Sequence, residues 1–376
     1  MRRHLALVVN NADFLVSHRM VLVRGALAAG YRVSAIVPDD AGVSTLERAG
    51  CDVHRWRLKR TGQSAPQEAV ALAHLTTLYA RLAPDLTHHV TVKAMLYGSL
   101  AARATRVRAV VNAVSGLGYV FLSEGLRARA RRELLKLGYR AAFTTPNSAV
   151  VLQNDDDEET LRQLGVLSGV RVEKIRGSGV DLNVFAPAPE PTQGPPLVVM
   201  PARLLRDKGT REFVEAARAL KREGIAARFA LVGGEDVGNP AGIPRAEVDR
   251  WVREGVVEWW GHRSDMPEVL RQSNVVCLPS YREGMPRALL EAAAMQRAIV
   301  TTDVAGCRDA VDHGRCGLLV PAKDAVALGA ALKEVLLNHT RREALAGAAL
   351  RHARANFSET GVLQQHLALY ESLLVK

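Results

Sequence analysis

The sequence has few cysteines, few aromatic side chains and no long apolar run. Its four cysteines, Cys51, Cys277, Cys307 and Cys316, show no CxxC spacing, so we expect reduced, buried thiols and no structural metal site. No apolar run approaches the roughly 20 residues of a membrane-spanning helix, and the run near the N-terminus is too short for a signal peptide. The sequence thus predicts a cytoplasmic protein that is soluble or lies on a membrane surface.

Common nucleotide-binding fingerprints are also missing. The closest approach to a dinucleotide motif, Gly116-Leu117-Gly118, has Phe121 where a third glycine should stand. Neither a GxxxxGK[ST] loop nor an HExxH motif occurs. The incomplete dinucleotide motif argues against a nicotinamide enzyme.

The chain has 376 residues, which is typical of two domains, and a formal net charge of +11. A basic surplus suits nucleotide phosphates, acidic membranes or nucleic acid. Nucleic-acid binding is the weakest of these interpretations, because the sequence has no aromatic-studded basic strand and no recognition-helix module.

Short apolar runs alternate with helical patterns along the chain, which is typical of doubly wound parallel sheets. Strands are predicted at residues 4–9, 32–37, 52–56, 86–90, 109–114, 197–202, 228–232, 257–260, 275–279 and 298–302. Between the two series lies APAPEPTQGPP, whose five prolines predict a linker. We therefore predict an α/β protein with an N-terminal Rossmann-like domain (1–185), a Pro-rich linker (186–196), a second Rossmann-like domain (197–357) and a C-terminal helix (358–376).

One βαβ unit in the second half carries the strongest chemical signal. Residues 275–279 predict a buried strand, Gly284 marks a turn, Pro286 opens a helix, and residues 298–302 predict the next strand. The backbone N–H groups of Gly284, Met285 and the first helical residues should point unsatisfied from the C-terminal edge of the sheet. The sequence therefore predicts an anion site there.

Two carboxylates flank this anion site, Glu283 in the turn and Glu291 in the helix, with seven residues between them. In addition, the turn PARLLRDKG places Arg203 and Lys208 after the first strand of the second domain, where a guanidinium and an ammonium suit a diphosphate. These motifs resemble the EX7E pattern and the Arg/Lys turn of retaining glycosyltransferases with the GT-B fold, family 4.

The resemblance implies two Rossmann-like domains that face a central cleft, and sugar transfer from a nucleotide donor. It implies that Arg203 and Lys208 hold the donor diphosphate, that Glu291 accepts the ribose hydroxyls, and that Glu283 accepts a hydroxyl of the transferred sugar. Arg263, in the turn GHRSD, falls near the nucleotide base, where base contact and solvent exposure both stay open. Because such transferases generally work without a metal, no cofactor is expected.

The loop NNADFLVSHRM in the first domain contains His18 and Arg19. Its ending resembles the branch of the family that acts on N-acetylated sugars of polyprenyl-diphosphate-linked glycans. His18 is expected at a helix start, where it would bind phosphate or acceptor, or serve a structural role. Both interpretations stay open.

Further acceptor-side candidates follow the fourth and fifth predicted strands. His88 and Lys93 are expected near the C-terminal edge of the sheet, and the loop glycines Gly116 and Gly118 permit a close backbone approach. His88 and His89 form a pair, but without nearby carboxylates they do not predict a metal site.

Residues 126–140, LRARARRELLKLGYR, contain six basic residues and one acid. Leu126, Ala130, Leu134 and Leu137 fall on one predicted apolar stripe with arginines around it. A solvated surface helix is the default interpretation, and docking on an anionic membrane is the functional one.

Together these features predict a retaining glycosyltransferase with Glu283, Lys208, Arg203 and His18 as catalytic candidates. It would move a sugar of the N-acetylated hexosamine type from a UDP-sugar to a glycan acceptor, lipid-linked through a polyprenyl diphosphate. We place it at the inner face of the plasma membrane, in assembly of cell-surface polysaccharide or glycoprotein glycans. A sugar-nucleotide epimerase of the same fold is the alternative, and donor interconversion without an acceptor would identify it.

Overall fold

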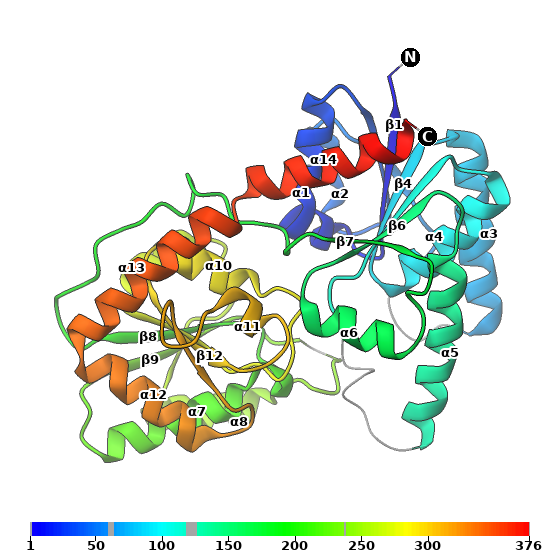
Figure 1. The fold of residues 1–376 in the computed structure, drawn as a ribbon. Helices are drawn as coiled ribbons and strands as arrows, with labels where there is room; N and C mark the ends of the chain where they lie inside the picture. The colour runs from blue at the N-terminus through cyan, green and yellow to red at the C-terminus, as the bar shows by residue number, and fades with distance from the viewer. Residues whose placement is uncertain (1, 59–63, 118–125, 237, 376) are drawn as a thin grey trace. The chain divides into compact units, whose positions relative to one another are not determined.

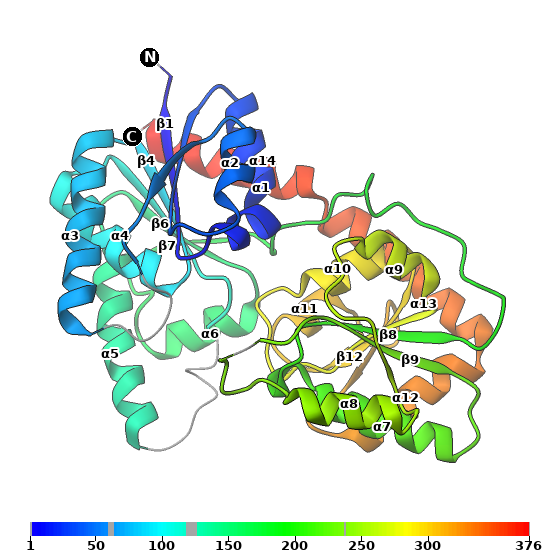
Figure 2. The same cartoon turned by 180° about the vertical axis from the view of Figure 1, so that it is seen from behind.

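The chain folds into two compact units. The computed structural model describes residues 2–58, 64–117, 126–236 and 238–375, with the backbone alone for 126–132. Unit 1 comprises Met1–Ser178 with Thr360–Lys376, and unit 2 comprises Gly179–Glu359. Each unit is a parallel sheet with helices on both faces (Figures 1 and 2). The predicted α/β class with two Rossmann-like units is confirmed.

In the described residues, unit 1 forms a seven-stranded sheet in the order β3-β2-β1-β4-β5-β6-β7. All neighbouring strands run parallel. Its central strands β1, β4 and β5 are buried over their whole length, as expected for a parallel sheet that is covered on both faces. The strands are β1 (His4–Val9), β2 (Arg32–Val37), β3 (Asp52–Arg55), β4 (Leu86–Val90), β5 (Ala109–Ala113), β6 (Ser148–Leu152) and β7 (Arg171–Lys174).

The helices of unit 1 are α1 (Ala12–Ala28), α2 (Val43–Arg48), α3 (Ala65–Leu82), α4 (Val92–Thr105), α5 (Leu126–Phe143), α6 (Asp155–Gln163) and α14 (Glu359–Leu374). Buried residues of α1, α2 and α14 pack on one face of the sheet, and those of α3 and α4 pack on the other. The C-terminal helix α14 is fixed there by polar contacts as well. The Tyr370 hydroxyl lies 2.6 Å from His88 Nδ1, and Glu371 accepts a 2.9 Å hydrogen bond from the Tyr31 hydroxyl.

Unit 2 repeats this plan with a six-stranded parallel sheet in the order β10-β9-β8-β11-β12-β13, counted in the described residues. The strands are β8 (Leu197–Pro201), β9 (Arg228–Val232), β10 (Glu258–Trp259), β11 (Val275–Leu278), β12 (Ala298–Thr302) and β13 (Leu318–Val320). The helices are η2 (Arg206–Lys208), α7 (Thr210–Arg222), α8 (Arg245–Arg253), α9 (Met266–Gln272), α10 (Arg287–Ala294), α11 (Cys307–Ala310), α12 (Ala325–Leu337) and α13 (His339–Asn356). Helices α7, α8 and α12 pack on one face, α9, α10 and α11 pack on the other, and α13 contributes to both apolar clusters.

Both strand orders reverse direction once. The reversal lies between β1 and β4 in unit 1 and between β8 and β11 in unit 2. In open parallel sheets, ligands bind beyond the carboxyl ends of the strands at such a switch point. A ligand site of unit 2 is therefore expected at the loops after β8 and β11.

The sequence predicts segment 186–196 as a Pro-rich linker between the domains. In the structure this segment is part of unit 2. The buried Arg297 side chain donates hydrogen bonds to the carbonyls of Ala188 and Pro189. Glu190 accepts a 2.6 Å hydrogen bond from Arg342. The prolines prevent regular structure, but these side chains fix the segment against the unit, and the division of the chain falls earlier, after Ser178.

Two other local predictions need correction. Helix α1 begins at Ala12 rather than at His18, because the Asn11 side chain accepts from the Phe14 N–H and caps the helix. Strands β6, β7 and β13 were not predicted from the sequence. The four cysteines are free and buried, as expected.

Candidate functional site

The turn after β8 carries Arg203 and Lys208. It closes through η2 onto Gly209, whose φ of 72° lies in the left-handed region. A Cβ atom at Gly209 would lie 2.0 Å from the Pro279 carbonyl oxygen, so this position requires glycine. The Tyr281 N–H donates to the Asp207 carbonyl at 2.9 Å, which ties this turn to the one after β11.

The turn after β11 presents Glu283 and leads into α10. The Glu283 N–H donates to the Ala305 carbonyl at 3.1 Å. Gly306 packs so closely that a Cβ atom there would lie 2.5 Å from the Gly284 carbonyl oxygen. The loop after β12 therefore packs against this turn and fixes the position of Glu283.

Pro286 is the N-cap of α10, with φ −75° and ψ 106°, and Arg287 is the first helical residue. Met285 packs against the apolar core of unit 2. The prediction of a turn at 280–285 followed by a helix at 286–295 therefore matches the structure to within one residue at each end of the helix.

Lys208 and Glu283 belong to two separate sequence motifs, and their side chains are in contact in the structure. The Lys208 ammonium lies 2.5 Å from Glu283 Oε1. The same carboxylate oxygen accepts a 2.6 Å hydrogen bond from the Ser280 hydroxyl. Both charged side chains are largely buried, so their attraction is screened less than that of a surface pair. Sequence reasoning missed Ser280, which lies two residues after the end of β11.

Arg203 pairs with Asp236 rather than with a member of the EX7E motif. The distance between Arg203 Nη1 and Asp236 Oδ2 is 2.5 Å, and Asn239 Nδ2 donates to the same oxygen at 2.9 Å. Asp236 lies after β9, next to β8 in the sheet. Its position was not identified from the sequence, because it belongs to no recognised motif.

Glu291 lies on α10 with 7% of its surface exposed. Burial raises the pKa of this carboxyl group, and the neighbouring Arg287, whose Nε donates to Oε1 at 2.7 Å, opposes that rise. Glu291 is therefore a buried acceptor held by a single cation. Arg263 pairs with Asp265 at 2.5 Å, and its guanidinium carbon lies 5.9 Å from the centre of the Trp260 ring.

Of the candidates in unit 1, His18 lies inside α1, with its ring stacked on Phe14 at a centroid distance of 4.4 Å. Arg19, the neighbouring candidate, is buried in the interior of the unit. It donates to the Gly177 carbonyl at 3.3 Å, and its Nε has no hydrogen-bond partner in the structure. Burial lowers the pKa of the Arg19 guanidinium to about 10.

His88 is also buried, because it lies within β4 and not after it. Its ring stacks on His366 of α14 at 5.5 Å, and the Nε2 atoms of both rings lack a hydrogen-bond partner in the structure. Burial and the nearby Arg19 lower the pKa of both imidazoles. Within the described residues, no group of three or more His, Cys, Asp or Glu side chains is arranged to hold a metal ion.

Lys93, at the start of α4, forms a 2.7 Å ion pair with Glu68 of α3. Just before it, Thr91 has φ 84° and ψ 152°, which is backbone strain of about 1–3 kcal/mol for a residue other than glycine. Gly116 has φ 105° and follows β5 by a short loop. Gly118 lies outside the described residues.

The basic helix forms as α5, but its buried face differs from the predicted stripe. Leu135, Tyr139 and Phe143 pack into the core of unit 1. Leu134 and Leu137 are instead 71% and 63% exposed. Among the described residues, no helix is both long and apolar enough to cross a membrane.

Comparison with known proteins identifies the class. Residues 195–338 match the family model for glycosyl transferases group 1, and residues 4–145 match that for glycosyl transferase 4-like domains. Sucrose-phosphate synthase from Thermosynechococcus elongatus has the same fold, with a TM-score of 0.82, 20% identity and complete coverage of both chains. The family models define a glycosyltransferase, and the fold is of the GT-B type. Residues 195–338 thus form a glycosyl transferase group 1 domain, and residues 4–145 form a glycosyl transferase 4-like domain.

Two curated relatives are similar over long stretches. A Campylobacter jejuni N,N'-diacetylbacillosaminyl-diphospho-undecaprenol alpha-1,3-N-acetylgalactosaminyltransferase is 28% identical over 95% of each chain. An Escherichia coli UDP-Gal:alpha-D-GlcNAc-diphosphoundecaprenol alpha-1,3-galactosyltransferase is 27% identical over 64% of this chain and 63% of its own. Relatives of this chain therefore act on glycans linked to undecaprenyl diphosphate.

Proposed function

We propose that this glycosyltransferase retains the anomeric configuration and moves a sugar of the N-acetylated hexosamine type from a UDP-sugar to a glycan on a polyprenyl diphosphate. The observation that carries the proposal is the contact between Lys208 and Glu283 at the switch point of unit 2. An ammonium suits a phosphate oxygen and a carboxylate suits a sugar hydroxyl. A donor diphosphate and its sugar would therefore separate this pair and bind one partner each.

The acceptor class and the nucleotide draw support from the two relatives. Both act on diphospho-undecaprenol glycans, one of them is an N-acetylgalactosaminyltransferase, and the other uses UDP-Gal. Glu291 supports a nucleoside donor, because its buried carboxylate can accept two ribose hydroxyls and would be left poorly paired by an analogue without them.

The reaction breaks the bond between the anomeric carbon and the β-phosphate oxygen. Negative charge then develops on the diphosphate, where Lys208, Arg203 and the N–H groups at the start of α10 stabilise it. The acceptor hydroxyl forms the new bond on the same face of the sugar, and its proton passes to the leaving diphosphate. These cationic and N–H groups supply the charge stabilisation that a metal supplies elsewhere, so we propose a metal-independent reaction.

We also propose that unit 1 works at an anionic membrane surface, on the cytoplasmic side. Leu134 and Leu137 on α5 are exposed beside Lys136, in a helix with six basic residues between 126 and 140. Exposed leucines with flanking cations are what an interfacial helix presents to a bilayer. The four free, buried thiols agree with a reducing compartment.

The test is a transfer assay with purified protein. UDP-, GDP- and ADP-sugars are offered with a synthetic N-acetylhexosaminyl-diphospho-prenyl acceptor, and the products are read by mass spectrometry and by the anomeric coupling constant. Transfer from a UDP-N-acetylhexosamine with the donor's anomeric configuration is expected. An inverted product, or donor interconversion without transfer, would overturn the proposal.

A further inference from the structure

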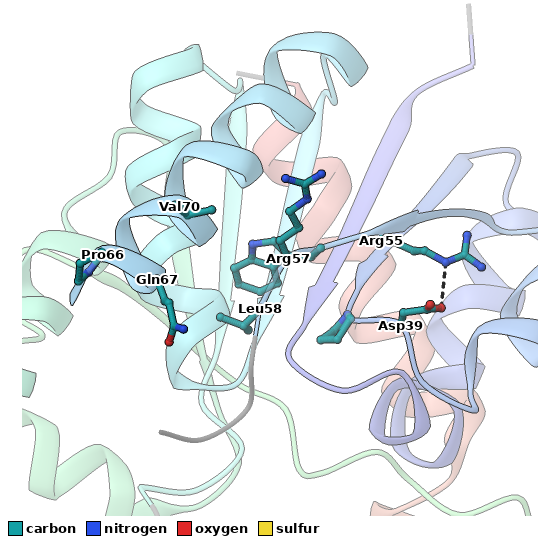
Figure 3. A pocket seen from close by; sticks show the side chains of 9 residues that line it. Asp39, Arg55, Arg57, Leu58, Pro66, Gln67 and Val70 are labelled. Carbon is teal, nitrogen blue, oxygen red and sulfur yellow. Dashed lines mark hydrogen bonds and ion pairs between the residues drawn. The ribbon is translucent and has the colours of Figure 1, made fainter. Parts of the chain in front are cut away.

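A pocket of about 580 Å³ lies in unit 1, at the carboxyl ends of β2 and β3. Its walls come from the residues that follow these two strands and from the first turns of α3 (Figure 3). Ligand sites of parallel sheets lie at this edge, and the volume falls in the range of small-molecule pockets, roughly 300–1,000 Å³. We call it the β2–β3 pocket.

The inner surface of the β2–β3 pocket is largely apolar. Pro38, Trp56, Leu58 and Val70 contribute to it. The Trp56 indole N–H donates to the Ala71 carbonyl at 2.9 Å, which fixes the ring as part of the wall. Trp56 and Leu58 are buried, whereas Val70 is 53% exposed. In Figure 3, Val70 projects from α3 toward the side of the pocket formed by the strand ends. An apolar ligand would cover this exposed wall.

The rim of the pocket is positively charged. Arg55 and Arg57 both line it, against one carboxylate, Asp39. Arg55 Nε lies 2.8 Å from Asp39 Oδ1, so this pair is neutral as a whole. Arg57 has an exposed side chain, and its backbone N–H donates to His74 Nδ1 at 3.2 Å, which anchors the residue at the rim. The described lining residues therefore carry a net charge of +1 beside an apolar interior.

An apolar interior beside a cationic rim fits an amphiphile with an anionic head. We infer that the β2–β3 pocket binds the prenyl-diphosphate end of the acceptor, with the isoprene units nearest the diphosphate against Val70 and Leu58 and the diphosphate at Arg57. This inference rests on the proposed function and names the part of unit 1 that holds the lipid. A nucleotide would leave the apolar wall uncovered, and an alkyl chain without phosphate would leave the rim cation unused.

The experiment measures binding of farnesyl diphosphate by calorimetry in detergent-free buffer, with inorganic diphosphate and farnesol as separate probes. Val70→Trp fills the pocket and is expected to weaken farnesyl diphosphate binding at least tenfold. Val184→Trp is the matched control, because Val184 is 55% exposed but belongs to unit 2, and it should leave binding unchanged. Arg57→Gln should weaken binding several-fold and reduce its dependence on salt.

A photoreactive benzophenone analogue of farnesyl diphosphate then locates the site. Crosslinks to peptides that contain residues 38–58 or 66–70 support the inference, even if a variant folds poorly. Crosslinks elsewhere, diphosphate alone binding as tightly as farnesyl diphosphate, equal binding by Val70→Trp, or no binding at all would overturn it. Binding of UDP and transfer to a soluble acceptor without a prenyl chain are measured in parallel. If both persist in Val70→Trp, failure of the pocket is separated from failure of the proposed function.

Discussion

Three charged candidates of unit 2 lie in surroundings unlike those of two candidates of unit 1. In unit 2, Lys208, Glu283 and Arg203 lie on turns beyond the strand ends, each within 2.5 Å of a countercharge. In unit 1, Arg19 and His88 lie inside the fold, and burial lowers the pKa of both. Charges on turns can exchange their partner for a ligand, whereas buried groups hold elements together. We therefore propose that the chemistry takes place in unit 2 and that the acceptor docks on unit 1.

The sharpest test of this division is Lys208→Ala. Removing one cation from the leaving diphosphate should lower the transfer rate roughly 100-fold, because loss of a single such donor typically costs about 3 kcal/mol of barrier. Lys333→Ala is the control, since Lys333 forms an exposed 2.6 Å pair with Glu223 in the same unit and should keep full activity. A transfer rate of Lys208→Ala within twofold of wild type would show that the catalytic site does not lie at this turn of unit 2.

This site was predictable because its parts lie in short turns. PARLLRDKG and the stretch around Glu283 each follow an apolar run directly, so their place at a sheet edge follows from the local pattern. Their mutual contact was not predictable, because it depends on β8 and β11 being neighbours in the sheet. The same limit hid Asp236, which approaches Arg203 from β9.

The predictions for unit 1 were less accurate for a related reason. His88 precedes the end of β4 by two residues, and its face of the strand is covered by α14, which lies far away in the sequence. Neither periodicity nor motif spacing contains that information. The prediction for the Pro-rich segment was limited in a similar way. Composition indicates an irregular backbone, but it does not show whether a buried arginine such as Arg297 holds that backbone in place.

The two carboxylates of unit 2 should differ in what they bind. Glu291→Gln is expected to weaken UDP binding about thirtyfold, because ribose hydroxyls lose a charged acceptor. Glu283→Gln should leave UDP binding nearly unchanged and lower the turnover rate instead. Calorimetry with UDP and steady-state kinetics separate the two effects. The same loss of UDP affinity in both variants would show that the roles are not divided.

A matched pair of arginine changes compares the units directly. Arg203→Met should lower kcat/KM about tenfold through loss of a charged hydrogen bond to the diphosphate. Arg19→Met should keep transfer within twofold, because a buried guanidinium without a carboxylate contributes little as a charge and methionine fills a similar volume. If Arg19→Met loses more activity than Arg203→Met, Arg19 contacts a ligand after all.

As the pH falls, unit 1 should lose stability at a higher pH than unit 2. The pKa of His366 is lowered to about 4 by burial and by Arg19, and its ring packs against His88 and Tyr370. The folded state then binds fewer protons than the unfolded chain, so stability is complete above the ordinary histidine pKa near 6.5 and falls below it. Between pH 7 and 5.5 the loss is about 1 kcal/mol for such a histidine.

Hydrogen exchange of α14 at the two pH values measures this loss, after correction for intrinsic rates. His366→Phe keeps the ring stack and removes one proton site, so it should flatten the pH dependence of α14. His339→Phe, on the exposed start of α13, should not. Acid loosening of α13 equal to that of α14 would contradict the assignment to unit 1.

The smallest expected effect concerns α5, where unit 1 would meet the bilayer. The double change Leu134→Gln and Leu137→Gln removes two exposed apolar side chains and leaves the basic residues in place. Flotation with vesicles of phosphatidylcholine and phosphatidylglycerol should fall about threefold. The fall should be clearer at high salt, because screening weakens the cationic part of the attraction and leaves the apolar part.

UDP binding by unit 2 should stay unchanged, and transfer to a prenyl-linked acceptor should slow more than transfer to a soluble one. Leu337→Gln, an equally exposed leucine in unit 2, is the control. Equal flotation of all three proteins would leave α5 an ordinary solvated helix, and the acceptor would then reach unit 1 without help from the membrane surface.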